Sequence, residues 1–314
     1  MKCYKKDYPR PQFVRDNWVN LNGTWDFGFD DANQGEKEKW YEKFPGELKI
    51  EVPFTYETKL SGIQDERRHD NIWYHKTITV DASKLTDNRL LIHFEGSDFH
   101  TKLWVNGAYA GDHKGGYARF SFDITELVKD GENELTVKVE DSFDTQQPRG
   151  KQRWIDENFG CWYVQTTGIW KTVWMESVPE SYLSALKLTP NLAQASLALE
   201  AQVEAADYGQ HLLLEAKVWH QGNFIASTTV AVTGKHVKAQ LSVANVGEHE
   251  WSVHTWTPNN PQLYDLELPR NISIQMGPQR AARRGMKSGL ISACGRSALR
   301  AGTCCSTAAL CISG

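Results

Sequence analysis

The sequence has no apolar run that approaches the ~20 residues of a membrane-spanning helix. Its first segment, Met1–Arg10, is polar and basic and no apolar stretch follows it, so it predicts neither a secretory signal nor an anchor. An excess of one charge is also lacking, because 35 Lys and Arg residues stand against 39 Asp and Glu residues. The net charge of −4 favours neither a nucleic-acid nor a membrane partner, and we expect a cytoplasmic protein.

Metal-binding patterns are absent as well. Cys3 and Cys161 are isolated, and the other cysteines lie near the C-terminus without CxxC or Cys/His spacing. The spacing of His93, His100 and His113 does not suit a metal either. A disulfide framework does not fit a cytoplasmic chain. We therefore expect no metal and no cofactor.

Long helical patterns are missing between residues 20 and 180. Short segments there alternate between apolar and polar residues, as in Leu90–Glu95 and Leu135–Glu140, which is the period of a half-buried strand. Asn106-Gly107 is a strong hairpin signal, because a type I′ turn needs positive φ at both positions. Many short strands separated by turn signals predict an all-β fold, a jelly-roll β-sandwich over residues 1–180.

A second block of strands, over residues 181–269, follows a junction at Val178-Pro179-Glu180. Six or seven strands in about 90 residues are typical of an immunoglobulin-like β-sandwich. The Cys…Trp…Cys pattern of antibody domains is missing, so the similarity is one of architecture. The strand-like segments are 183–188, 197–203, 212–218, 224–232, 237–243, 251–256 and 263–268.

Residues 270–314 differ abruptly in composition. Asn271–Gly314 contain no Asp or Glu, and their Arg and Lys residues are interspersed with Gly, Ala, Ser and Cys. One interpretation is a basic arm for nucleic acid, and a second is a disordered tail. The interpretation that we favour is a shift of the reading frame near Leu268–Arg270, because the composition changes within a strand-like segment. We expect an unstructured tail.

Several segments, in this order, resemble family 2 glycoside hydrolases. Thr166–Glu176, TTGIWKTVWME, is the most specific of them. Each segment is weak alone, but together they extend the resemblance over roughly residues 8–268. The others are Asn17–Phe27, Val52–Phe54, Trp73–Lys76, Trp104–Gly107, Gly111–Tyr117, Phe122–Thr125, Gly131–Leu135, Trp256–Pro258 and Pro261–Tyr264.

The resemblance implies a jelly-roll sugar-binding domain, an immunoglobulin-like domain and a third domain, a (β/α)8 barrel of about 250 residues. Too few residues follow Leu268 to form that barrel. Retaining glycosidases need two carboxylates about 5–5.5 Å apart, which this family takes from barrel strands. We therefore expect the N-terminal portion of a β-galactosidase-like glycoside hydrolase, inactive alone. The alternatives are a standalone carbohydrate-binding module and a structural interaction protein.

Two polar loops, Gln64–Asn71 and Arg149–Asn158 with the following Gly160–Tyr163, are the candidates for contacts with a β-galactoside or related glycoside, because in relatives such loops reach over the barrel. Both contain groups for sugar hydroxyls, and the second also contains aromatic rings that can stack on a sugar. The surface meant for the barrel, with Trp154, Trp162 and Trp170, would favour self-association. The candidate substrate-binding residues are Asp70, Asn71, Lys151, Gln152, Trp154, Asp156 and Trp162.

Overall fold

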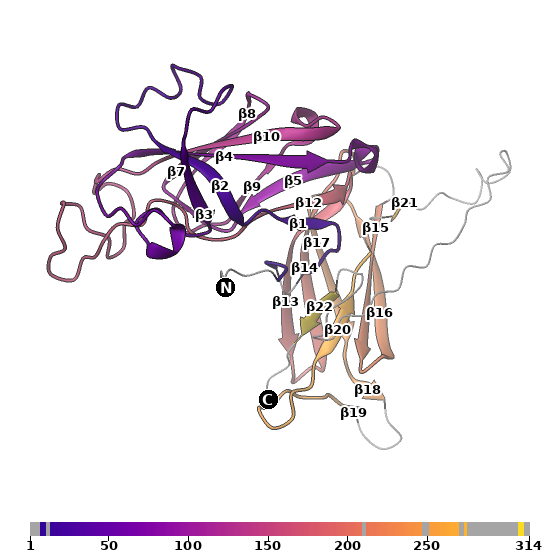
Figure 1. Ribbon diagram of the computed structural model, residues 1–314. Coiled ribbons are helices and arrows are strands. Elements are labelled where there is room, and N and C mark those ends of the chain that lie inside the picture. Colours follow the sequence, from indigo (N-terminus) through magenta and orange to yellow (C-terminus); the bar gives the residue numbers. More distant parts are fainter. Residues whose placement is uncertain are drawn as a thin grey trace. The chain divides into compact units, whose positions relative to one another are not determined.

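The computed structural model describes residues 7–10, 13–208, 212–246, 251–269, 273–274 and 307–310. Within these ranges the regular elements are β-strands and three short 3-10 helices (Figure 1). No helix among them is long and apolar enough to cross a membrane. The chain forms two compact units, Met1–Pro9 with Trp18–Ser177 and Arg10–Asn17 with Val178–Gly314.

The first unit is a sandwich of antiparallel sheets. One sheet has the strand order β1-β12-β5-β9, a larger one has the order β3-β2-β4-β10-β7-β8, and β11 pairs with β6. The elements are β1 (Trp18–Asn20), β2 (Gly23–Phe29), β3 (Leu48–Val52), η1 (Lys59–Ser61), β4 (Asn71–Val80), η2 (Ala82–Leu85), β5 (Asn88–Phe94), β6 (Ser97–Asp98), β7 (His100–Val105), β8 (Ala108–Lys114), β9 (Phe120–Asp123), η3 (Thr125–Leu127), β10 (Gly131–Glu140), β11 (Gly168–Ile169) and β12 (Val173–Pro179).

The core of this unit follows the alternation in the sequence. Leu135, Val137 and Val139 of β10 are buried in one apolar cluster with residues of both sheets. The hairpin between β7 and β8 turns at Asn106 and Gly107, which both have positive φ, as the sequence predicts. The strand pattern therefore specifies both the register and the buried face.

The outer face of the larger sheet is also covered. Trp73 and Trp104 stack with ring centroids 5.4 Å apart, and Tyr41, from the segment between β2 and β3, stacks on Trp104 at 5.2 Å. Beside them the ammonium of Lys138, whose side chain is 2% exposed, lies 2.9 Å from a carboxylate oxygen of Glu36 in the same segment. Aromatic stacking and an ion pair to the buried Lys138 thus hold this segment on the sheet.

The second unit contains two further antiparallel sheets. One has the order β13-β14-β17, and the other has the order β16-β15-β20-β22, with β21 also pairing with β15; β18 pairs with β19. Their facing residues form a separate apolar core, which includes Phe13. The strands are β13 (Tyr182–Asn191), β14 (Ser196–Glu204), β15 (Leu212–His220), β16 (Asn223–Val232), β17 (His236–Ser242), β18 (Asn245–Val246), β19 (Trp251–Ser252), β20 (Tyr264–Glu267), β21 (Ser273–Ile274) and β22 (Thr307–Leu310).

The predicted fold class is confirmed: the chain is all-β, with two successive sandwiches. The units divide between Ser177 and Val178, and the short segment Arg10–Asn17, which the sequence places with the first domain, belongs to the second unit. β21 and β22 are strands within residues 270–314, where the sequence predicts no structure. The rest of that predicted tail lies outside the described residues.

Candidate functional site

Two loops start beside each other because of the register of β4 and β10. Asn71, the first residue of β4, is the register partner of Glu140, the last residue of β10. The segment that leads into β4, Gln64–Asn71, and the segment that leaves β10, Asp141–Gln165, therefore meet at one edge of the sheet. We refer to them as the 64–71 loop and the 141–165 loop. They contain all the predicted sugar-binding residues.

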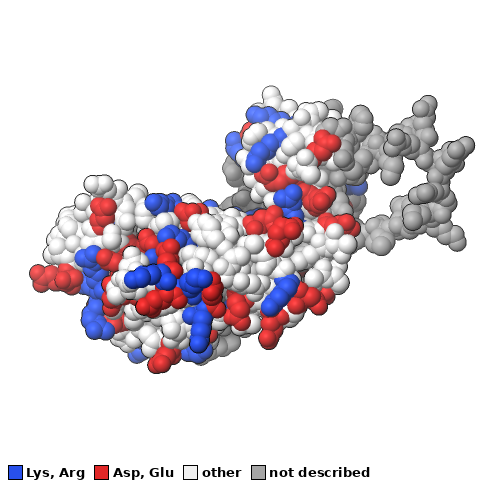
Figure 2. All heavy atoms as spheres, turned by 90° about the horizontal axis from the view of Figure 1, so that it is seen from above, with Lys and Arg blue, Asp and Glu red and all other residues white. Residues whose placement is uncertain are grey.

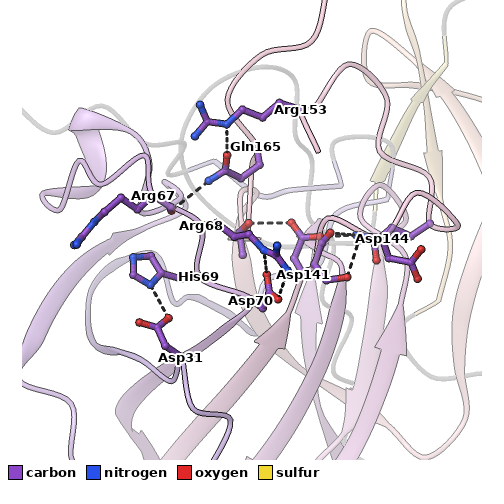
Figure 3. A network of polar contacts seen from close by, with 12 residues as sticks. Asp31, Arg67, Arg68, His69, Asp70, Asp141, Asp144, Arg153 and Gln165 are labelled. Atoms are coloured by element: carbon purple, nitrogen blue, oxygen red, sulfur yellow. Dashed lines mark hydrogen bonds and ion pairs between the residues drawn. The ribbon is translucent and has the colours of Figure 1, made fainter. Parts of the chain in front are cut away.

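Arg153 fastens the two loops to each other (Figure 3), and its residue is only 5% exposed. Its Nε donates to Gln165 Oε1 over 2.9 Å, and Nη1 donates to Asn158 Oδ1 over 3.3 Å. Its Nη2 donates to the backbone carbonyl of Glu66 in the other loop. Gln165 Nε2 in turn lies 3.3 Å from the carbonyls of Glu66 and Arg67. One buried guanidinium thus binds acceptors in both loops.

Arg149 is a second buried arginine of the 141–165 loop. Its guanidinium donates to the carbonyl of Ser142 and, over 3.3 Å, to the carbonyl of Arg153, and it lies 3.5 Å from Asp141 Oδ1. The other oxygen of Asp141 accepts a 2.9 Å hydrogen bond from the Thr167 hydroxyl. Burial raises the pKa of Asp141, and the positive charge of Arg149 opposes that rise. The loop is therefore held by polar bonds on its inner side.

The arginines of the 64–71 loop form ion pairs within the loop. Arg68 binds both carboxylate oxygens of Asp70 at 2.5 Å, and its guanidinium lies 4.6 Å from the ring centroid of Phe143 in the other loop. Arg67 donates to both oxygens of Asp65 and holds the pKa of that carboxyl well below its usual range. Asp70, a predicted acceptor for sugar hydroxyls, is thus already engaged by a guanidinium.

Three aromatic rings gather in the 141–165 loop. Trp154 meets Phe159 edge-on with ring centroids 4.9 Å apart, and it meets Trp162 edge-on at 4.8 Å. Phe159 and Trp162 stack at 5.0 Å. All three rings are only partly buried, and the neighbouring Tyr163 is 61% exposed. This aromatic cluster offers ring faces and edges of the kind on which sugars pack.

Some of the other predicted residues have hydrogen-bond partners within the described residues, and others have none. Gln152 donates to Asp98 Oδ2 over 2.7 Å and accepts from the Thr166 backbone N–H over 2.7 Å, so its amide supports the loop. The side chain of Asn71 has no hydrogen bond to the part of the chain that the structure describes. Lys151 and Asp156 are exposed and form no ion pair with any described residue. The loop that carries the aromatic cluster therefore retains an unpaired ammonium and an unpaired carboxylate, while Asn71 is buried with only 8% of its surface exposed.

Two buried carboxylates lie beneath these loops. Burial raises the pKa of Glu57 to about 7, and burial together with the charge of Asp141 raises the pKa of Asp98 to about 7. Such values are typical of catalytic acids. Here, however, both groups are buried, and they accept hydrogen bonds from the backbone N–H of Thr167 and the amide of Gln152. Their contacts indicate support of the 141–165 loop and its connection to β11, not contact with substrate.

The sequence does not reveal which loop residues are anchors. Arg149, Lys151 and Arg153 stand two residues apart, and only the structure shows that the two arginines are buried while the lysine is exposed. Gln165 also carries no recognisable motif. Composition alone therefore finds the polar and aromatic character of the loop but not the direction of each side chain.

The comparison that decides the family concerns the first unit. Residues 18–179 match the sugar binding domain of glycosyl hydrolases family 2. The chain belongs to glycoside hydrolase family 2. The resemblance carried by the sequence motifs is thereby confirmed.

Similar proteins are longer than this family 2 chain. A Formosa agariphila protein named a β-glucuronidase is 28% identical over 276 residues, which are 86% of this chain and 30% of that protein. A β-galactosidase of Thermoanaerobacter pseudethanolicus is 28% identical over 203 residues, 62% of this chain and 25% of that enzyme. The structure of Lactobacillus rhamnosus β-glucuronidase, 22% identical, aligns with a TM-score of 0.63 over 84% of this chain and 43% of that one. The chain thus spans less than half of each.

Proposed function

We propose that this chain is the sugar-binding, N-terminal portion of a β-galactosidase-like family 2 glycosidase. In this proposal the 64–71 and 141–165 loops bind a β-galactoside or related glycoside, and a catalytic domain supplies the two carboxylates that hydrolyse the O-glycosidic bond. The chain by itself does not hydrolyse glycosides. We also propose that it acts in the cytoplasm.

The observation that carries this proposal is the aromatic cluster on a fixed loop. Trp154 and Trp162 share the 141–165 loop with Lys151 and Asp156, which are exposed and have no ion pair with any described residue. Stacking surfaces with a few polar groups around them suit a sugar ring and its hydroxyls. Hydrogen bonds hold this arrangement in place, which limits the conformational entropy lost on binding.

Intrinsic tryptophan fluorescence tests the binding. Titration of the full chain with methyl β-galactoside should give a saturable change, which Trp162→Phe should reduce. Trp219→Phe, in the second unit, is the control and should leave the sugar-dependent change intact. No saturable change with this sugar or an oligosaccharide would contradict the binding role.

An assay with nitrophenyl β-galactoside and nitrophenyl β-glucuronide tests the predicted inactivity. We expect no turnover above a heat-treated sample, because the buried carboxylates support the protein and do not face a substrate. Clear turnover by the purified chain would contradict this part of the proposal.

Two alternatives make different predictions. A standalone carbohydrate-binding module would bind sugar as tightly as a complete enzyme does, since it would need no further domain. A structural interaction protein would bind another chain and no sugar.

Self-association is favoured by the exposed apolar side chains of Tyr117, Ile155 and Tyr163, with exposed fractions of 52%, 41% and 61%. Light scattering that shows only a monomer would contradict self-association.

A further inference from the structure

The charges of the two loops do not balance. Together the 64–71 and 141–165 loops contain seven Asp and Glu residues and five Lys and Arg residues. Arg67, Arg68 and Arg149 lie against Asp65, Asp70 and Asp141 in the contacts described above. The remaining acids are exposed and have no ion pair with any residue in the described ranges. We call these four the acidic rim: Glu66, Asp144, Asp156 and Glu157.

The two remaining cations, Arg153 and Lys151, do not form ion pairs with the acidic rim. Arg153 is buried, and its Nε, Nη1 and Nη2 all donate to neutral amide or carbonyl oxygens. Lys151 is the one exposed cation of these loops without an ion pair to described residues. Proteins hold a carboxylate ligand best with a free guanidinium, which can donate two parallel hydrogen bonds. Arg67 and Arg68 are already paired with carboxylates, and Arg149 and Arg153 are buried, so every guanidinium of the two loops already has an acceptor.

The electrostatic influence of the rim extends from one loop to the other. Asp156, in the 141–165 loop, adds to the raised pKa of Arg68 in the 64–71 loop, after the larger effects of Asp70. Asp156 is also only two residues from Trp154 in the aromatic cluster. On the face shown in Figure 2, red and blue side chains are intermixed. A local excess of acid, and not a large field of one sign, therefore acts here.

We propose that the acidic rim makes these loops select neutral sugars over uronic acids. This selectivity depends on the sugar-binding role proposed above. The hydroxyls of a neutral sugar can donate to free carboxylates and accept from the exposed Lys151. A uronate would add a negative charge where the loops already have an excess of acid and no free guanidinium. Since the similar proteins include both β-glucuronidases and β-galactosidases, family membership does not decide between these sugars.

Two ligands isolate the effect of charge. Methyl β-galactoside and methyl β-galacturonide share their stereochemistry and differ at C6, where one has CH2OH and the other a carboxylate. Both are titrated into the full chain at low salt and followed by tryptophan fluorescence. We expect the galacturonide to bind about fivefold more weakly, as a few partly screened charges would cause. The ratio should approach unity at high salt.

Charge-neutralising variants locate the effect. Asp156→Asn with Glu157→Gln should reduce the difference between the two ligands, mainly by strengthening the galacturonide. Glu126→Gln, an exposed carboxylate in η3 outside both loops, is the matched control and should leave the ratio unchanged.

The outcomes separate the two proposals. Binding of the neutral sugar together with an equal or stronger affinity for the uronate would overturn the selectivity but leave the binding role intact. An affinity ratio that the rim variants do not change would also overturn the role of the rim. Binding of neither ligand would overturn the sugar-binding role and the selectivity that depends on it.

Discussion

Replacing Arg153 with methionine tests whether one buried guanidinium fixes the two loops. The substitution keeps a long apolar side chain but removes every donor. Gln165 Oε1 then becomes a buried acceptor without the Arg153 donor, while the Glu66 carbonyl keeps its contact with Gln165. Hydrogen bonds to charged groups contribute about 1.5–3 kcal/mol each, and removing a buried charge offsets part of that loss. We expect the free energy of unfolding of the first unit to fall by about 3 kcal/mol.

Urea unfolding measures this change. Nine of the 12 tryptophans lie between Trp18 and Trp174, so intrinsic fluorescence mainly reports the first unit. The midpoint of Arg153→Met should fall by about 1 M or more, given typical slopes of unfolding in urea. Lys151→Met, in the same loop but exposed and without an ion pair to described residues, is the matched control and should change it little.

Equal urea midpoints for Arg153→Met and Lys151→Met would refute the reasoning.

Hydrogen exchange adds a local test. The backbone N–H of Arg153 donates to the carbonyl of Tyr163 over 2.7 Å, and that of Tyr163 donates to Lys151 over 2.8 Å. Both amides should exchange faster in Arg153→Met, because the loop opens more often without its anchor. Unchanged exchange would show that other contacts hold the loop.

Two further predictions concern buried groups of the first unit. Glu57 has a pKa of about 7, above its usual value, so the folded state binds the proton more tightly and stability falls as the pH rises from about 4.5 to 7. In Glu57→Gln the melting temperature should depend less on pH over this range than in the wild type. Parallel profiles of melting temperature against pH would contradict the raised pKa of Glu57. Gly168→Ala should destabilise the unit by about 3 kcal/mol or more, because its Cβ would lie 2.1 Å from the Tyr74 hydroxyl and its φ is +92°. Gly234→Ala, where a Cβ meets no atom within 4 Å, is the control, and equal melting temperatures would contradict the expected clash.

Strand patterning made most of the fold predictable. Alternation in β5 and β10 identifies the core face, and Asn106-Gly107 identifies a turn, because these features depend on residues close together in the sequence. The packing of the segment between β2 and β3 on the outer face of the larger sheet was not predictable. Lys138 stands at a polar position of an alternating strand, which normally faces solvent, but it is buried and pairs with Glu36 of a distant segment.

The candidate site was predictable as a region but not as a set of contacts. The polar loops and their tryptophans stand out in composition, and the structure brings both loops together. Whether Asp70 is free or bound to Arg68, however, depends on side-chain directions that no local pattern encodes. The same is true of Arg153, whose acceptors lie in both loops.

Phe13 shows that the second unit is not contiguous in the sequence. Its side chain is buried in the core of that unit, although Trp18–Ser177, which form most of the first unit, are synthesised between Phe13 and the rest of that core. During translation this early segment must therefore wait for its partners until the last strands emerge from the ribosome. A chain cut at Val178 would lack the phenylalanine and have a cavity in its place. An independently folding version of the second unit needs these residues added back, for example through a linker.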